Sequence, residues 1–340
     1  MIYKNVELHN VDQVVETPDG LRLCRIPEKV RGAINESARD VRAYNTCGCE
    51  IRFNLTGEEA RIVLRKASGN SITEAGLAEV YFGSFQAGYP TTPAAVGLSG
   101  QTLIIRKPPN LPQLKAIAQE RRLPFDPELV RVILPYDWIY EIVSIEGDLA
   151  PPRPGQTPGL RFLAYGSSIT HGGDAARPTG TYAMRTAQRL GADLLNKAFA
   201  GSAHMDEAIA EYVAGRDDWD FATVEMGINV IRFWETELFE RKVERFLSVI
   251  CEKRPDKWVF CTDLFLCIHD LENREKIGAF REAAAKTAEK LGHPKLRYFP
   301  GTELLTSWNG LSADLVHPSA AGQEEIAANF ASKIAQAMGR

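Results

Sequence analysis

Residues 161–173 read RFLAYGSSITHGG, an apolar run of strand length followed by a glycine and two serines. Gly166 permits a sharp exit from a strand, and the residues after it open a loop or helix whose free N–H groups point outward. A serine at this place, Ser168, has an exposed hydroxyl beside donors that could hold a developing oxyanion. The same letters also fit a serine-rich turn or a phosphate-cradling loop, so the stretch alone leaves three interpretations open.

Downstream of this stretch, short apolar runs alternate with longer amphipathic segments. The runs are Arg161–Tyr165, Leu194–Ala200, Phe221–Met226, Trp258–Phe265 and Leu296–Phe299. The last amphipathic segment shows the helical period, because apolar side chains recur every fourth residue from Ile326 to Met338. This alternation predicts an α/β fold with a parallel sheet and helices on both faces. Ligands of such sheets bind beyond the carboxyl ends of the strands.

Upstream, the pattern is that of an all-β domain. Ile51, Phe53 and Leu55 alternate with polar residues, the period of a half-buried strand. Further strand-like runs are Arg61–Arg65, Glu79–Phe82, Thr102–Arg106 and Ile139–Ile145, and only Leu111–Arg122 looks helical. We therefore expect a β-sandwich, jelly-roll-like domain at residues 1–150.

A proline-rich segment separates the two patterns. The stretch LAPPRPGQTPGL at 149–160 holds four prolines, which remove backbone donors and fix φ. Such a segment is expected to join neither sheet nor helix. The sequence thus predicts an N-terminal domain at 1–150, a linker at 151–160 and a catalytic domain at 161–340.

Composition narrows the classes of function. The 340 residues are 44% hydrophobic and 25% charged, with a formal charge of −4, which argues against a nucleic-acid-binding protein. No apolar run reaches the length of a membrane span, and the first residues lack the apolar core of a secretion signal, so a cytoplasmic location is expected. The six cysteines lack zinc-like spacing and are interpreted as structural thiols.

A second stretch shows how weak the serine pattern is by itself. Gly69-Asn70-Ser71-Ile72-Thr73 matches it almost as well. Because it joins two predicted strands, it is interpreted as a hairpin turn and not as a strand-to-helix elbow.

Near the other end of the chain, Asp314-Leu315-Val316-His317-Pro318 precedes the final helix. An imidazole exchanges protons near neutral pH and can take the proton of a serine hydroxyl. A carboxylate three residues earlier can bind Nδ1 while Nε2 faces the serine. The alternative is that Asp314 or Ser319 only caps the helix and that His317 lies on the surface.

Two other predicted strand ends offer hydrogen-bond donors. Gly201 follows the second strand and could present its backbone N–H, and Asn229 follows the third and could present its side-chain amide. A close-packing glycine and an asparagine that binds its own loop are the alternatives. Taken together with Ser168 and His317, these groups fall on one predicted ligand-binding edge, which favours an acyl-transfer site.

The order Gly-x-Ser-Ile-Thr, then Gly, then Gly-x-Asn, then Asp-x-x-His-Pro resembles the four blocks of the SGNH (GDSL-like) serine hydrolase superfamily. The resemblance covers about 161–340 and implies a flavodoxin-like three-layer domain. It implies Ser168 as nucleophile, His317 as base and Asp314 as its orienter. It also implies an oxyanion hole formed by the Ser168 N–H, the Gly201 N–H and the Asn229 side chain.

The stretch from Gly166 to Tyr182 is similar to a bacterial subgroup that carries GSSIT or GTSIT. Two positions depart from the wider pattern: Ser167 and Val230 stand where the family commonly has aspartate. Neither position is a triad or oxyanion position, so altered loop bonding is expected and not lost chemistry.

The resulting hypothesis is a serine esterase that hydrolyses short-chain acyl esters, acetyl esters above all, without metal or organic cofactor. An N-terminal β-sandwich before such a domain resembles the layout of carbohydrate esterases, so sugar esters are candidate substrates and no nucleic acid or membrane partner is expected. A lipase- or thioesterase-type acylhydrolase, a binding protein with a decayed hydrolase domain and a phosphate-binding protein remain alternatives. His204, Arg177, Trp234 and Trp308 are candidates for lining the pocket, with surface or core positions as the alternative.

Overall fold

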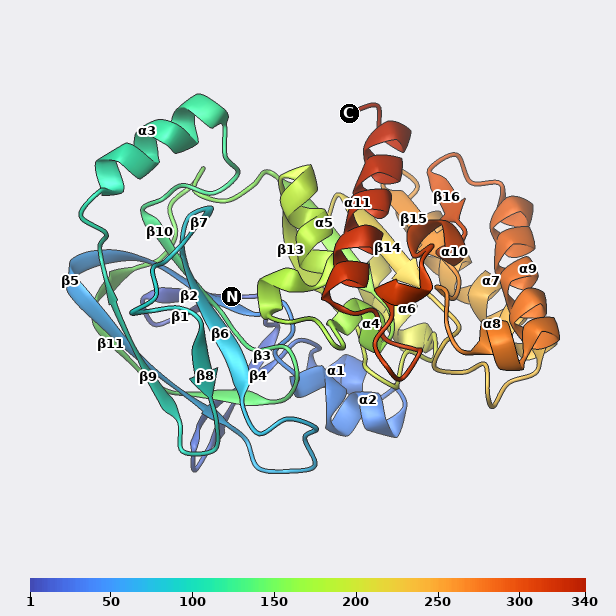
Figure 1. The fold of residues 1–340 in the computed structure, drawn as a ribbon, viewed down its shortest axis with the longest axis horizontal. Helices are drawn as coiled ribbons and strands as arrows, with labels where there is room; N and C mark the ends of the chain where they lie inside the picture. The colour runs from blue at the N-terminus through green and yellow to red at the C-terminus, as the bar shows by residue number, and fades with distance from the viewer.

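A computed structural model describes residues 1–340. Figure 1 shows an antiparallel β-rich part at residues 1–150 beside an α/β part formed by the rest of the chain. The α/β class and the strand-rich N-terminal part predicted from the sequence are confirmed.

The N-terminal part contains eleven strands that are joined into one hydrogen-bonded network. The strands are β1 (Ile2–Tyr3), β2 (Val6–His9), β3 (Gln13–Thr17), β4 (Gly20–Cys24), β5 (Glu50–Lys66), β6 (Gly76–Phe82), β7 (Phe85–Gln86), β8 (Ala94–Val96), β9 (Gln101–Arg106), β10 (Leu129–Ile133) and β11 (Tyr140–Ala150). The predicted strand-like runs lie in β5, β6, β9 and β11, except that Ile139 precedes β11. The short strands β1 to β4, β7, β8 and β10 were not predicted.

The long strand β5 connects two layers of this network. Its first residues pair with β2 on one side and with β10 on the other. Its later residues pair with β9 and β11, and the end of β11 also pairs with Asn54 and Leu55. The apolar side chains of both sets fill one common core, the arrangement of a β-sandwich.

The N-terminal part also holds three α-helices: α1 (Glu28–Arg31), α2 (Glu36–Asp40) and α3 (Leu111–Arg121). The helix predicted at 111–122 is therefore confirmed, and α1 and α2 were missed. Each of the missed helices has only four or five residues, too few to display a helical period. The Asn35 side chain caps α2 by accepting a hydrogen bond from the Ala38 N–H.

The C-terminal part is built on five parallel strands in the order β13-β12-β14-β15-β16. They are β12 (Leu160–Tyr165), β13 (Ala192–Asn196), β14 (Phe221–Glu225), β15 (Trp258–Thr262) and β16 (Leu296–Phe299). All five overlap predicted apolar runs, but β13 begins two residues before the predicted run Leu194–Ala200 and ends at Asn196. Numbered along the chain, this order is 2-1-3-4-5, that of the flavodoxin-like fold.

Helices cover both faces of the parallel sheet, as the strand–helix alternation predicted. On one face lie α5 (Tyr182–Leu190) and α11 (Ala320–Ala337), which pack with Phe162 and Ala164 of β12. On the other lie α6 (Glu207–Ala214), α7 (Thr236–Lys253) and α9 (Arg274–Leu291), which pack with the alternate side chains of β12. Three single-turn helices complete the domain: α4 (Ser168–His171), α8 (His269–Glu272) and α10 (Gly301–Leu304).

The two parts meet through buried polar side chains. Arg52 donates to both carboxylate oxygens of Asp193 at 2.7 and 2.6 Å and is itself buried. Arg52 is one of the polar residues that alternate with Ile51, Phe53 and Leu55, and the C-terminal part covers it. Arg25 likewise donates to the carbonyl oxygens of Asn196 and Ala198.

The proline-rich segment is irregular from 151 to 159, but β11 extends through Ala150 and β12 begins at Leu160. The expectation of a sheet-free segment across 149–160 is therefore wrong at its two ends.

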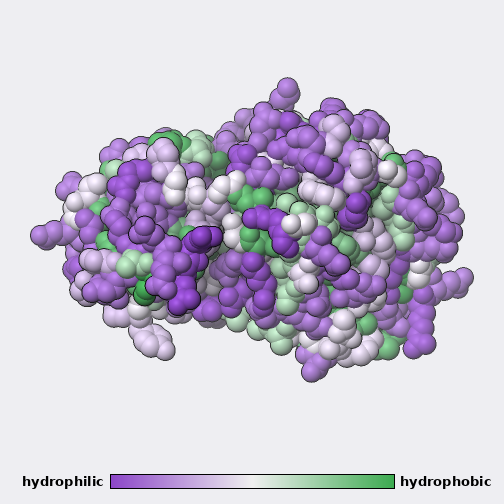
Figure 2. All heavy atoms as spheres, turned by 90° about the horizontal axis from the view of Figure 1, so that it is seen from above, coloured by the Kyte–Doolittle hydropathy of each residue, from purple (hydrophilic) through white to green (hydrophobic).

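The surface in Figure 2 is mostly hydrophilic, with hydrophobic residues in small separate patches. No helix has the length and apolar character that crossing a bilayer requires.

Candidate active site

Ser168 lies where the first parallel strand turns into a helix. It is the first residue of α4, directly after β12, and the Ser167 side chain caps this helix by accepting from the Ile169 N–H. A Cβ atom at Gly166 would lie 2.1 Å from Thr170 Oγ1 and 2.5 Å from Glu225 Oε2, so only glycine fits there. The resulting turn is the predicted strand-to-helix elbow, and Ser168 on it is half-buried.

His317 meets Ser168 although 149 residues separate them in the chain. It lies in the loop before α11, where its carbonyl oxygen accepts from the Ser312 N–H. Its Nε2 lies 2.7 Å from Ser168 Oγ. This is the juxtaposition that the sequence predicted.

Asp314 lies on the other side of the imidazole, with Oδ2 at 2.5 Å from His317 Nδ1. Its Oδ1 accepts from the backbone N–H groups of Val316 and His317. Partial burial opposes ionisation, but the hydrogen bonds from His317 and the two N–H groups outweigh it and hold the pKa of Asp314 below its usual value. An ionised carboxylate only accepts, so His317 Nδ1 carries a proton and Nε2 is free to accept the Ser168 hydroxyl.

Gly201 and Asn229 lie on the loops after β13 and β14, which flank β12 in the sheet. The first loop is bonded to the elbow, because the Phe199 N–H donates to the Gly166 carbonyl oxygen, and the two loops are bonded to each other, because the Ala203 N–H donates to Asn229 Oδ1 at 3.1 Å. That last bond uses Oδ1 and leaves the Nδ2 group of Asn229 available. Neither this group nor the N–H groups of Gly201 and Ser168 donate to any acceptor of the protein.

Gly173 adjoins the imidazole in a way the sequence did not reveal. A Cβ atom there would lie 2.7 Å from His317 Cδ2 and 3.1 Å from the Ser168 carbonyl oxygen. The backbone at Gly173 is not left-handed. The position therefore demands glycine because of the imidazole.

We expect Gly173→Ala to lower kcat for a p-nitrophenyl ester by about 10²-fold, since a displacement of the imidazole of about 1 Å misaligns it with Ser168. Steady-state kinetics and a thermal melt measure this effect. Gly159→Ala is the matched control, because its added methyl meets no atom within 4 Å. Wild-type kcat in Gly173→Ala would contradict the packing described here.

The four residues suggested by the sequence as lining the pocket differ in their burial and in their contacts. His204 is half-buried and lies against Trp234, with ring centroids 6.1 Å apart. Arg177 donates to Gln86 of the N-terminal part, so it contributes to the contact between the two parts. Trp308 is 40% exposed. No hydrogen bond or ion pair links these four residues to Ser168 or His317.

Sequence reasoning missed the N-terminal contribution to the elbow. His171, the last residue of α4, is buried with Nε2 at 2.7 Å from the Tyr136 carbonyl oxygen, which accepts from it. Burial lowers the pKa of His171 to about 3, so the ring is neutral. The Tyr136 hydroxyl donates to the Ala175 carbonyl. These partners are distant in sequence and carry no local signal.

Ser71, the serine of the second stretch that matches the pattern, lies in the N-terminal part. Residues 69–73 connect β5 and β6, but these strands pair with β10 and not with each other. The interpretation as a hairpin turn is therefore wrong, although the segment is a loop between strands as expected. The Ser71 hydroxyl donates to the Thr73 carbonyl.

Two further features could bind small ligands. Asp174, Asp314 and His317 present possible metal-ligand atoms within 4.8 Å of one another, but two of them already form the pair beside Ser168.

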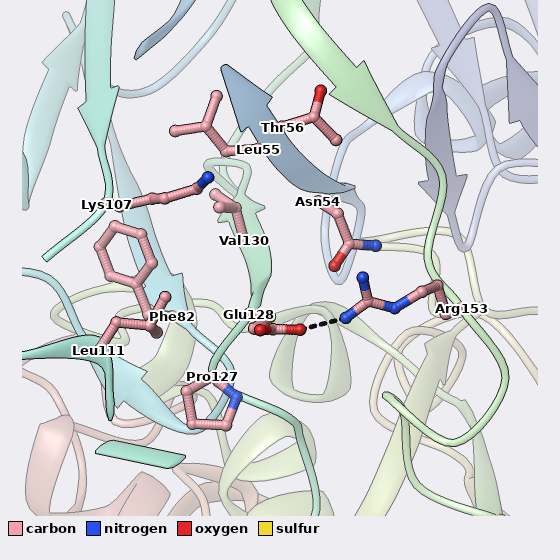
Figure 3. Close-up of a pocket in the computed structure, with 10 residues that line it drawn as sticks. All are labelled: Asn54, Leu55, Thr56, Phe82, Lys107, Leu111, Pro127, Glu128, Val130 and Arg153. Carbon is pink, nitrogen blue, oxygen red and sulfur yellow. Dashed lines mark hydrogen bonds and ion pairs between the residues drawn. The ribbon is translucent and has the colours of Figure 1, made fainter. Parts of the chain in front are cut away.

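A separate cavity of about 300 Å³ lies in the N-terminal part (Figure 3). It is lined by Asn54, Leu55, Thr56, Phe82, Lys107, Leu111, Pro127, Glu128, Val130 and Arg153, and its Glu128 is already paired with Arg153 and Lys115. All six cysteines are free and buried.

Part of the chain matches the model of a known protein family. Residues 164–325, a little less than half of the chain, match the model of the GDSL-like lipase/acylhydrolase family. The matched segment runs from β12 into α11 and includes every predicted site residue. No curated protein matches the sequence.

Solved structures resemble the chain over nearly its whole length. The salicylyl-acyltransferase SsfX3 from a tetracycline biosynthetic pathway is 18% identical with a TM-score of 0.79, over 99% of this chain and 95% of that one. A family two carbohydrate esterase from Clostridium thermocellum, solved with cellohexaose, is 13% identical with a TM-score of 0.63, over 98% and 99%. The acetyl xylan esterase Est2A from the rumen bacterium Butyrivibrio proteoclasticus is 14% identical with a TM-score of 0.58, over 88% and 92%. At these identities the likeness concerns the fold, and it includes the N-terminal part.

Proposed function

We propose that the GDSL-like lipase/acylhydrolase domain at residues 164–325 is a serine esterase that removes short acyl groups, acetyl groups above all, from carbohydrate or other small alcohols. The observation that carries this proposal is the hydrogen-bonded series Asp314–His317–Ser168. It lies at the carboxyl ends of the strands, where ligands of such sheets bind.

In the first step, Ser168 Oγ attacks the ester carbonyl carbon while its proton passes to His317 Nε2. The Asp314 carboxylate accepts from Nδ1 and stabilises the imidazolium that forms. The tetrahedral intermediate collapses as His317 returns the proton to the leaving alcohol. The acyl group then remains bonded to Ser168.

The developing oxyanion needs donors that are already in place. The N–H groups of Ser168 and Gly201 and the Asn229 side-chain amide are three donors without an acceptor in the protein. Such preorganised donors stabilise charge that appears only in the transition state, and removing one costs about 10²–10³ in rate in acyl-transfer enzymes.

In the second step, water takes the place of the alcohol. His317 removes a proton from the water as its oxygen attacks the acyl carbon, and Ser168 leaves with that proton. The acid is released and the starting state returns. Each step uses groups of the chain itself, so the mechanism calls for no metal or organic cofactor.

The proposed substrate class rests on the architecture. Two of the similar structures are named as a carbohydrate esterase and an acetyl xylan esterase, and their likeness to this chain extends over the N-terminal part. Fold alone does not establish a substrate, so the alcohol must be tested directly.

We expect acetyl esters to be hydrolysed with a kcat/KM at least about 10-fold above octanoyl esters of the same alcohol, because the chain has no long apolar lid segment to bind an extended acyl chain. A panel of p-nitrophenyl acetate, butyrate and octanoate measures the acyl preference, and acetylated xylo- and cello-oligosaccharides measure the alcohol preference. A preference for octanoate would favour a lipase-type hydrolase instead.

Acyl transfer to an alcohol is a second candidate, favoured by the full-length likeness to an acyltransferase at a TM-score of 0.79. Both reactions share the acyl-enzyme and differ in the acceptor. Adding an alcohol acceptor to the p-nitrophenyl acetate assay separates them. Acetic acid equal in amount to p-nitrophenol indicates hydrolysis, and an acetylated acceptor indicates transfer.

A further inference from the structure

A buried carboxylate lies directly beneath the elbow that carries Ser168. Glu225 is the last residue of β14 and is 1% exposed. Its Oε2 accepts from the Ser167 N–H at 2.5 Å and from the Thr170 hydroxyl at 3.1 Å. It therefore binds the elbow on both sides of Ser168.

The elbow is shaped to let this carboxylate approach. The absent side chain of Gly166 leaves the space that Oε2 and Thr170 Oγ1 occupy. The Thr170 hydroxyl also contacts the Tyr182 hydroxyl at 2.5 Å, and the Thr170 carbonyl accepts from Asn196 Nδ2 at 2.9 Å. Contacts from β13, β14 and α5 thus converge on Ser167 and Thr170, which lie on either side of Ser168 in the chain.

Holding Glu225 in this place is costly. Burial raises its pKa, against the hydrogen bonds from Ser167 and Thr170 that favour the ionised form. No lysine or arginine pairs with it, and its second oxygen, Oε1, has no hydrogen-bond partner. An incompletely paired buried carboxyl is destabilising relative to an apolar side chain, so packing alone does not account for it.

We propose that Glu225 is a positioning residue that fixes the Gly166–Ser167 peptide at the start of the elbow and thereby holds the Ser168 N–H toward the developing oxyanion. The inference rests on the proposed serine mechanism. The Ser167 N–H belongs to the peptide before Ser167, and the Ser168 N–H belongs to the next peptide. The Ser167 side chain caps α4 and Glu225 also binds Thr170 beyond Ser168, so the backbone between the two peptides is held and fixing the first orients the second. The Glu225 carboxyl contacts no reacting atom and acts through this backbone.

The test compares substitutions that keep or remove the acceptor. In Glu225→Gln the amide oxygen still accepts from the Ser167 N–H, and we expect kcat within about 10-fold of wild type. In Glu225→Ala the bond is lost, and we expect kcat to fall about 10²-fold with KM nearly unchanged, as for loss of one oxyanion donor. Thr223→Val is the matched control: Thr223 lies on the same face of β14, is buried, and its hydroxyl also lacks a partner.

Affinity for a short alkyl boronic acid supplies a readout that loss of stability does not move, because the boronate adduct of Ser168 places an oxygen at the oxyanion position. We expect its Kd to rise with Glu225→Ala in proportion to the loss of kcat/KM, and melting temperatures show that each variant is folded. Wild-type kcat in Glu225→Ala, an increase in KM alone, or a loss in Glu225→Gln as large as in Glu225→Ala would each overturn the positioning role.

Ser168→Ala measured in parallel separates this inference from the proposed function. An inactive Ser168→Ala with a fully active Glu225→Ala would refute only the role of Glu225. An active Ser168→Ala would refute the serine mechanism itself.

Discussion

Ser168→Ala is expected to lower kcat for p-nitrophenyl acetate at least about 10³-fold, because no other hydroxyl of the elbow is hydrogen-bonded to His317. Ser168 Oγ lies 2.7 Å from His317 Nε2, and alanine removes the atom that attacks the substrate. The residual rate reflects the oxyanion donors acting on water. Initial rates at saturating substrate measure the effect.

The chain contains its own control for this substitution. Ser71 occupies the same place in a nearly identical pentapeptide, GNSIT, but lies in the loop between β5 and β6. Ser71→Ala should keep the wild-type rate. Equal losses in the two alanine variants, or none in either, would reject Ser168 as the nucleophile.

His317→Ala is expected to cost about as much as Ser168→Ala, and the double variant should be no slower than either single one. Residues that act as a unit give strongly non-additive losses, because each alone already disables the step. Rates of the two single variants and of the double variant on the same ester measure this coupling.

His293→Ala serves as the control for removing a histidine, since its ring only accepts from the Lys295 N–H. Losses from Ser168 and His317 that multiply in the double variant would mean that the two side chains act independently. That result would contradict the hydrogen-bonded pair on which the mechanism depends.

The parallel sheet was predictable because its signal is local. Its strands lie in short apolar runs, and β12 to β15 are buried along most or all of their length, so the runs stand out in the sequence. The elbow and the Asp314-x-x-His317 turn are also local, since their defining contacts span only a few residues. The contact between Ser168 and His317 then followed from the rule that ligand sites gather at one edge of such a sheet.

The N-terminal part was less predictable, and the reason is physical. β1 and β7 have only two residues and β8 has three, too few to display an alternating period. Arg52 fits the solvent face of its strand by pattern, yet it is buried against Asp193, 141 residues away. The charge pairing that permits this burial is visible only in three dimensions.

The roles of Glu225 and Gly173 could not be recognised from the sequence, because they too depend on residues that are distant in the chain. Glu225 ends a strand whose other buried residues are mostly apolar, and its partner Ser167 is 58 residues upstream. Gly173 is one glycine among 27, and its importance depends on a histidine near the other end of the chain. Neither position carries a motif.

Trapping the acyl-enzyme tests the central claim most directly. The protein is mixed with p-nitrophenyl acetate, quenched in acid within the first turnover, digested and examined by mass spectrometry. We predict one acetyl group on the peptide that contains Ser168, and no acetylated peptide from His317→Ala under the same conditions. Turnover of the ester with an unmodified Ser168, or with the acetyl group on another residue, would contradict the account.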